Sequence, residues 1–327
     1  MVISLIGLMG FLLPTLALET QGTNFLIDGK PTFLLGASYY GGLGASDDFV
    51  DKDLKKLKEL GFNWIRVWAT WGAFDNNVSA IDYQGNAREP YMSKLKKLCE
   101  KTDKLGMVVD VTLSRGDGVA SSGSLPSQEA HLNAVTVLAK ELKPYRNIYI
   151  DLANERNIKD RRYVTFNELS ILRDRIKEID PYRLVTASQG GDISPEELKR
   201  YLEEVKIDFI TPHRPRHSGS PQETADKTKE YLQLMRDMGK VVPLHYQEPF
   251  RRGYAEEWEP VANDFLTDLK NAKENGAAGW CFHNGDASYR IDGRPRRSFD
   301  MRPEEGKLFS QLDEEDEKIV SQAGSIK

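Results

Sequence analysis

The chain has 327 residues, of which 39% are hydrophobic and 29% charged, and its 45 Lys and Arg against 50 Asp and Glu give a net charge of −5. This composition excludes a disordered chain, a collagen-like fibre and a protein with many membrane spans. The pI near 5.7 argues against a nucleic-acid-binding protein, which would usually be basic. Two cysteines, Cys99 and Cys281, are too few for a disulfide framework or a usual zinc site.

The amino terminus is apolar. Residues 1–18 contain no charged side chain, and the run from Val2 to Leu18 is similar to the core of a secretory signal peptide. Thr15 and Ala17 are small enough for the −3 and −1 positions of a cleavage site. We predict a signal peptide over 1–18, a single folded domain over 19–327, and a secreted or periplasmic protein with no other membrane contact. An uncleaved anchor or a misassigned start is the alternative.

After Thr20, short apolar runs alternate with charged amphipathic segments. The runs, which we predict as strands, are Phe33–Ala37, Phe62–Trp68, Met107–Leu113, Ile148–Ala153, Leu184–Ala187, Phe209–Thr211, Val241–Tyr246 and Ala277–Phe282. The predicted helices are Asp51–Leu60, Tyr91–Leu105, Gln128–Leu142, Phe166–Ile179, Pro195–Val205, Thr224–Met238 and Val261–Asn275. From one run to the next is about 35 residues on average, which is the length of one βαβ unit.

Eight strands buried on both faces, each followed by a helix, predict an α/β protein with a single closed (β/α)8 barrel, the TIM barrel. An open doubly wound sheet is the alternative. It would normally use fewer strands and carry a dinucleotide loop, but no GxGxxG motif is present, and the glycines of 36–44 have the wrong spacing. The acidic run 313–318 is predicted as the solvated face of a last helix.

Two acids stand at the carboxyl ends of predicted strands, where a barrel of this kind has its active site. Glu155, after Asn154, ends the fourth strand, and Glu248 ends the seventh. These strands lie across the barrel mouth from each other, so both carboxylates can face one cleft. Cleavage of a glycosidic bond needs two such groups, one to protonate the leaving oxygen and one to attack the sugar or activate water. Because a regular pleat would point Asn154 and Glu155 in opposite directions, we expect a bulge or turn there.

With these motifs the chain resembles the clan A glycoside hydrolases, and in particular the cellulase-like family 5 enzymes. The resemblance rests on Asn154-Glu155, Glu248, Arg66 in WIRVW and Trp280 in GWCFHNG, and it spans residues 25–284. It implies a retaining mechanism with Glu248 as nucleophile and Glu155 as general acid/base. It further implies that Asn154 binds the sugar 2-hydroxyl, Arg66 pairs with Glu248 and Trp280 forms the floor of the sugar site.

The sixth strand departs from the family pattern, which has His-x-Tyr where this chain has PHRPRH. His213 fits the histidine, but Pro215 takes the place of the tyrosine that touches the nucleophile. Tyr246 or Tyr40 could substitute for it. Trp68 at the end of a predicted strand and Tyr40 just beyond one could also stack on sugar rings. His213 and His217 have a spacing that could suit a metal, but no third ligand is evident, and we expect neither metal nor cofactor.

The predicted mouth loops hold an unusual number of arginines: Arg115, Arg156, Arg214, Arg216, Arg251, Arg252 and Arg290. Guanidinium groups match oxyanions, so one hypothesis is a substrate with carboxylates or sulfates. We prefer the alternative that these arginines pair with local acids such as Asp117 and Asp286.

The predicted function is hydrolysis of a β-linked oligo- or polysaccharide by a monomer whose partner is its carbohydrate substrate. An exo-acting or transglycosylating enzyme of the same clan is the alternative within enzymes. A non-catalytic sugar-binding barrel is the alternative from another class. A phosphate-dependent isomerase or aldolase would need a phosphate loop after the last two strands, and often a Schiff-base lysine within a strand.

Overall fold

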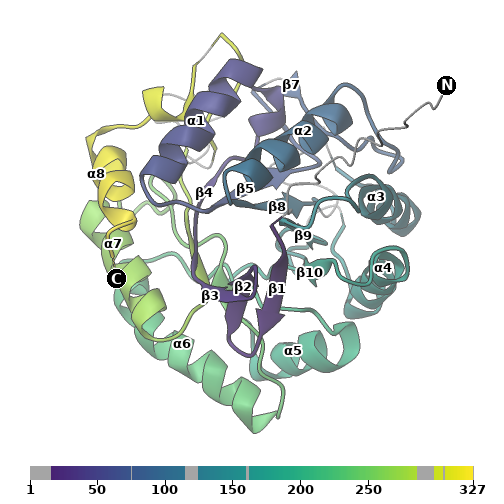
Figure 1. Cartoon of the computed structure of the whole chain (residues 1–327). Helices are drawn as coiled ribbons and strands as arrows, with labels where there is room; N and C mark the ends of the chain where they lie inside the picture. The colour runs from purple at the N-terminus through teal and green to yellow at the C-terminus, as the bar shows by residue number, and fades with distance from the viewer. Residues whose placement is uncertain are drawn as a thin grey trace, which may run out of the picture.

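The computed structural model describes residues 16–74, 76–114, 124–159, 162–285, 298–304 and 306–326. A curled parallel sheet of seven strands has the order β10-β9-β8-β5-β4-β12-β11. Its strands are β4 Leu34–Ser38, β5 Trp64–Trp68, β8 Val108–Thr112, β9 Ile148–Asp151, β10 Leu184–Thr186, β11 His245–Tyr246 and β12 Gly279–Phe282. Parallel bridges from Gln189 to Pro212 and from Ile210 to Leu244 join both edges through the sixth predicted strand. The sheet thereby closes into the predicted (β/α)8 barrel (Figure 1).

Eight described helices surround this sheet (Figure 1). They are α1 Asp47–Glu59, α2 Tyr91–Lys104, α3 Gln128–Glu141, α4 Phe166–Ile179, α5 Pro195–Arg200, α6 Ser220–Asp237, α7 Ala262–Glu274 and α8 Glu314–Ala323. Side-chain caps fix several starts: the hydroxyl of Thr165 accepts from the amide of Glu168 at the start of α4. The predicted helix over 195–205 is α5 continued by a π turn, Tyr201–Val205. No described helix is long and apolar enough to span a bilayer.

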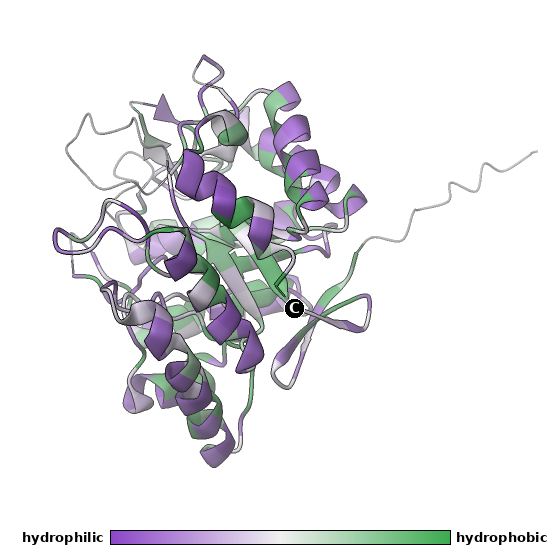
Figure 2. Ribbon diagram, turned by 90° about the vertical axis from the view of Figure 1, so that its left-hand side faces the viewer, coloured by the Kyte–Doolittle hydropathy of each residue, from purple (hydrophilic) through white to green (hydrophobic). Residues whose placement is uncertain are grey.

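A small antiparallel sheet of β1 Leu18–Gln21, β2 Asn24–Ile27 and β3 Lys30–Thr32 closes the amino-terminal end of the barrel. Figure 2 shows it standing outside the helices at one end of the molecule. Leu16, Leu18 and Phe25 are buried against apolar barrel residues such as Trp64. Leu18 thus packs against the barrel, and the domain boundary at residue 18 stays a prediction. The rest of the predicted signal, 1–15, lies outside the described residues.

Inside the barrel, the two-residue period of the strands sorts side chains into layers. On β5, Trp64 belongs to the apolar lower layer, Arg66 lies above it among polar groups, and Trp68 reaches the mouth cavity. Ile65 and Val67, between them, belong to the large cluster that includes the helices' apolar faces. The same alternation decides which residues of every strand can reach the site.

The carboxyl-terminal acidic run is not a purely solvated face. Asp313 caps α8 by accepting from the amides of Glu315 and Asp316. Asp316 itself is fully buried and accepts a hydrogen bond from the Asn284 side chain at 2.7 Å. The prediction of a solvated run is therefore wrong at Asp316, which ties the last helix to the end of β12.

Candidate active site

The structure brings the two predicted acids together. Glu155 follows β9 and Glu248 follows β11, 93 residues apart in sequence, yet one carboxylate oxygen of each lies within 4.8 Å of the other and of a nitrogen of His213. Such a short separation fits the roughly 5 Å arrangement of retaining glycosidases better than the roughly 6.5–9.5 Å of inverting ones.

The predicted turn is present at Glu155, and the backbone is strained there. Its φ is +46°, in the left-handed region that non-glycine residues rarely adopt. The amide of Glu155 donates to the hydroxyl of Ser188 at 3.0 Å, which holds the turn in place. As a result Asn154 and Glu155 both line the mouth cavity.

Glu248 is 5% exposed and has a donor on each oxygen. Its Oε2 receives Arg66 Nη1 at 2.6 Å and the Tyr40 hydroxyl at 3.1 Å, and its Oε1 receives Arg216 Nη2 at 3.0 Å. The predicted Arg66 contact is therefore present, and Tyr40 supplies the tyrosine contact that PHRPRH lacks. Charge-assisted bonds of this kind fix both the position and the ionised state of a carboxylate.

Arg66 is a fully buried hub beneath the cavity. Besides Glu248, its guanidinium donates to Asp151 Oδ2 and Asn154 Oδ1, both at 3.0 Å, and to Thr112 Oγ1 at 3.1 Å. A buried guanidinium with this many partners is rigid, because the loss of any partner would leave a polar group unpaired. Arg66 thus sets the relative positions of Glu248 and Asn154.

The surroundings hold Glu248 ionised. Burial alone would raise its pKa, but the nearby His283 and His213 rings and the Arg66 and Arg216 guanidiniums together hold the pKa well below its usual range. A permanently charged carboxylate is what a nucleophile requires.

The empty site does not hold Glu155 in the protonated state that a general acid needs. Burial and the Glu248 charge raise its pKa, but a hydrogen bond from His213 Nδ1 at 3.2 Å and the Arg216 charge outweigh them. The pKa of Glu155 therefore lies below the ordinary value when the cleft is empty. With its side chain 21% exposed, this group can still respond to a substrate that covers it.

A cavity of about 400 Å³ opens above these groups. Its lining includes the predicted Tyr40, Trp68, Asn154, Glu155 and Glu248, and also Ile158, Arg214, Pro215, Arg216, Arg251 and Tyr254. His213 lies just beneath, fully buried, with its Nδ1 facing Glu155. The sequence indicates Arg216 and Arg251 only as mouth arginines, and it gives no signal for Tyr254 or Ile158, whose loop positions carry no strand period.

Two predicted sugar contacts are wrong. Trp280 is fully buried behind the sheet, where its indole Nε1 donates to Asp268 Oδ2 of α7 at 2.6 Å. Tyr246 also points outward, and its hydroxyl lies 2.8 Å from Thr228 Oγ1 of α6. Both stand one residue out of phase with the inward-facing neighbours on their strands, so neither can touch a sugar in the cavity.

The mouth arginines divide into two groups. Three of them pair with acids that do not line the cavity: Arg156 with Glu197, Arg214 with Asp192, and Arg252 with Asp313. Arg216 and Arg251 instead face Glu248. Arg115, Arg290, Asp117 and Asp286 lie outside the described residues.

The trio of Glu155, His213 and Glu248 could in principle ligate a cation. However, Arg66 and Arg216 already neutralise Glu248, so an added cation would meet two guanidiniums. His217, the other residue of the metal hypothesis, is half exposed and faces Glu223. The donor set fits acid–base chemistry better than metal binding.

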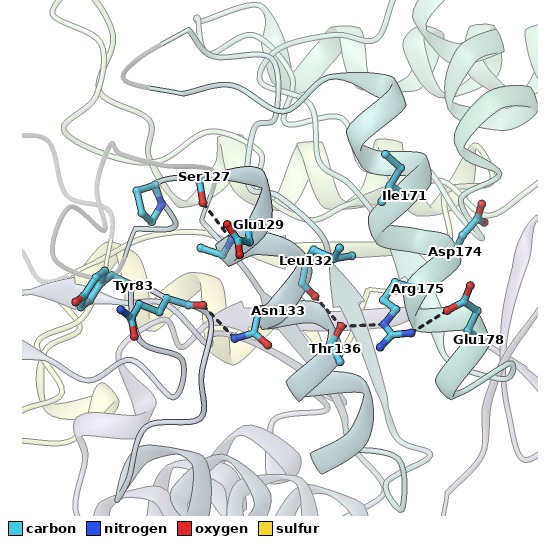
Figure 3. A pocket seen from close by; sticks show the side chains of 13 residues that line it. Tyr83, Ser127, Glu129, Leu132, Asn133, Thr136, Ile171, Asp174, Arg175 and Glu178 are labelled. Atoms are coloured by element: carbon cyan, nitrogen blue, oxygen red, sulfur yellow. Dashed lines mark hydrogen bonds and ion pairs between the residues drawn. The ribbon is translucent and has the colours of Figure 1, made fainter.

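A larger hollow of about 940 Å³ lies on the outer face, between α3 and α4. Figure 3 shows its helix-surface side chains, with Thr136 and Glu178 engaged by Arg175 and Asn133 turned towards the Tyr83 loop. Its acids come from helix surfaces rather than strand ends, so the smaller cavity at the barrel mouth is the candidate active site.

Comparison with known proteins identifies a family and several similar folds. A family model described as cellulase (glycosyl hydrolase family 5) matches residues 19–238. The fold is similar to an endo-1,4-β-mannanase from Rhizomucor miehei (14% identity, 94% of this chain and 98% of that chain, TM-score 0.69). It is also similar to a hyperthermostable endo-1,4-β-D-mannanase from Thermotoga petrophila (15%, 90% and 100%, 0.65) and to a family 5 glycoside hydrolase from Bacteroides vulgatus (16%, 82% and 61%, 0.65). A search of curated proteins returned no significant match.

Proposed function

The chain belongs to the cellulase family, glycosyl hydrolase family 5, and is a glycoside hydrolase; from this premise we propose that it cleaves β-linked oligo- or polysaccharides with retention of configuration. The observation that carries the proposal is the contact geometry of Glu155 and Glu248, whose oxygens lie within 4.8 Å over one cavity. The match to the family model ends before Glu248, so the role of this residue rests on the geometry.

In the first step Glu248 attacks the anomeric carbon and forms a glycosyl ester, while the glycosidic C–O bond breaks and its electron pair takes the proton of Glu155. In the second step Glu155 removes a proton from water, the hydroxide adds to the anomeric carbon, and Glu248 leaves as a carboxylate. Asn154, held by Arg66 at 3.0 Å, is placed to bind the sugar 2-hydroxyl beside the nucleophile.

Glu155 must hold a proton at the start of this cycle. A sugar ring seated on Trp68 and Tyr40 would cover the exposed part of Glu155 and expel water, which raises the pKa of a carboxyl group. The ring would also separate Glu155 from Arg216, whose Nη2 lies 3.6 Å away. Substrate binding thereby prepares the acid that the empty site lacks.

The test is a pair of variants assayed on β-1,4-mannan, β-1,4-glucan and aryl β-glycosides. Glu248→Ala should abolish turnover on all of them, with the unfolding transition still cooperative. Glu155→Gln should lose about 10²–10⁴-fold on polysaccharides, the usual value of general acid catalysis, but less on aryl glycosides, whose leaving groups need no proton. Unchanged turnover in Glu248→Ala, or glycan binding without products in the wild type, would reject the proposal.

The mannanase neighbours make β-mannan the first polymer to assay, although identities of 14–15% carry the fold alone. An extracellular location, with a signal peptide over 1–18, and a monomeric state complete the proposal. Secretion into the medium and a light-scattering mass equal to that of one processed chain would support these two points.

A further inference from the structure

Arg251 is a buried cation at the active site with few partners. Its side chain is 9% exposed and lines the mouth cavity. Nη1 lies 3.8 Å from Glu248 Oε1, beyond hydrogen-bond distance, and Nε is buried with no hydrogen-bond partner. In the described part of the chain, this guanidinium donates no hydrogen bond.

A second cation stands beside it. Arg216 also lines the cavity, and the guanidiniums of Arg216 and Arg251 lie 4.8 Å and 4.7 Å from the centre of the Tyr254 ring. Stacking on an aromatic ring orients a guanidinium but leaves its N–H groups unsatisfied. Burial and the Arg216 charge lower the pKa of Arg251 to about 10, so both side chains remain charged at neutral pH.

The other mouth arginines show what ordinary pairing looks like in this protein. Arg214 donates to Asp192 at 2.9 Å, and Arg156 to Glu197 at 3.0 Å. Neither of these acids belongs to the catalytic pair. Arg251, in contrast, has only the nucleophile within ion-pair distance among the described residues.

The charge count of the catalytic cycle makes the imbalance larger. Three guanidiniums, those of Arg66, Arg216 and Arg251, surround the site, and Asp151 and Glu248 are two anions that face them. Once Glu155 carries its proton, one positive charge has no counterpart. This excess of one persists in the glycosyl ester, because Glu155 has then given up its proton while Glu248 has lost its charge.

Asp110, the remaining acid beside Arg66, does not remove the imbalance in acidic solution. Burial raises its pKa to about 7, so below neutral pH its carboxyl is largely protonated.

We propose that Arg251 and Arg216 form a subsite for an anionic group of the substrate sugar, which is a carboxylate or a sulfate ester. Both guanidiniums lie against the ring of Tyr254. The inference rests on the proposed hydrolase function and narrows its substrate to acidic glycans. An oxyanion between the two guanidiniums would satisfy their free donors and draw Arg216 away from Glu248. Glu248 Oε1, to which Arg216 donates at 3.0 Å in the empty site, would then lose this donor.

The test compares matched substrates on the wild-type enzyme. β-1,4-Mannan and β-1,4-glucan oligosaccharides are each assayed in the neutral form, oxidised at C6 to the uronate, and sulfated at C6. We expect kcat/KM for an anionic form to exceed that of its neutral parent by about 10- to 100-fold, the range of a charge-assisted hydrogen bond. The uronate and sulfate arms identify which anion is recognised.

Arg251→Gln should lower this preference by about tenfold or more, whereas Arg251→Lys should keep part of it. Arg236→Gln removes the same charge from an exposed position at the end of α6 that leads into β11, and should leave the preference unchanged. Because the preference is a ratio within one protein, a partly unfolded variant does not alter it.

Any result in which neither anionic form is cleaved faster than its neutral parent overturns the anion subsite. If the neutral parents or aryl glycosides are still cleaved, the hydrolase proposal stands. If no glycoside of any kind is cleaved, the hydrolase proposal fails as well.

Discussion

Replacement of Tyr40 by Phe should separate the two chemical steps. The Tyr40 hydroxyl donates to Glu248 Oε2 at 3.1 Å, and this bond is strong only while Glu248 is an anion. In the glycosyl ester the charge is gone, so the variant destabilises the free enzyme relative to the intermediate. A hydrogen bond to a charged group contributes about 1.5–3 kcal/mol, or roughly 10- to 150-fold in an equilibrium constant.

The second step regenerates the carboxylate and should slow by up to this factor, whereas the first step should not slow in proportion. The fold should be kept, because the ring still packs on Trp68 and Trp71, with centroids 5.4 Å and 5.3 Å away. With an aryl β-glycoside that needs no acid, stopped-flow absorbance should show a burst of one phenol per enzyme and then a slow steady state.

Tyr40→Phe should also raise the pKa of Glu248 and move the acidic limb of the kcat/KM profile to higher pH. Wild-type steady-state rates without a burst, or an equal slowing of both steps, would show that the hydroxyl does not stabilise the departing carboxylate.

Three further outcomes follow from the buried acids. Trp280→Phe should lower the free energy of unfolding, measured in urea, by about 1.5–3 kcal/mol, because it removes the 2.6 Å hydrogen bond to Asp268. The KM should stay within about twofold of the wild-type value. A raised KM at unchanged stability would show that Trp280 contacts the sugar. Burial raises the pKa of Asp268 from 3.8 to about 6, so the free energy of unfolding should fall by about 2.4 kcal/mol as pH rises from 4 to 7. Asp268→Asn should abolish this fall, and an unchanged pH dependence in that variant would contradict the assignment. The pKa values of both Glu155 and Glu248 are lowered in the empty site, so kcat/KM, which reports the free enzyme, should fall with rising pH from an acidic optimum. The activity measured as kcat, which reports the substrate complex, should extend to higher pH. A kcat/KM that is flat to pH 8 would show that Glu155 holds its proton without substrate.

Much of the fold is predictable because it rests on repeated local signals. Apolar runs and amphipathic segments marked each barrel strand, and Phe166–Ile179 coincides with α4. The Arg66–Glu248 contact was implied by the family resemblance alone. The two-residue period of a strand excludes Trp280 from the sugar site. Its neighbour Cys281 belongs to the cluster inside the barrel that also contains Trp64, so Trp280 must point outward. The Arg216–Arg251 cluster was not predictable, because it depends on loop geometry and on Tyr254.

The two catalytic acids show why strand periodicity alone cannot place an active site of this kind. His245 packs inside the barrel and Tyr246 packs outside it, so a continued pleat would point Glu248 outward. Instead the amide of Gln247 donates to the carbonyl of His245 at 3.0 Å, a three-residue turn that ends the pleat and leaves Glu248 facing Arg66.

Glu155 reaches the same cavity through its left-handed backbone, φ +46°. Each acid thus leaves the regular strand at the point where its side chain must face the substrate. The hydrogen bonds that hold these turns, from Glu155 to Ser188 and within 245–247, come from the backbone amides and lie beside the reacting groups. The barrel provides rigid strand ends, and the irregular residue after each end supplies the chemistry.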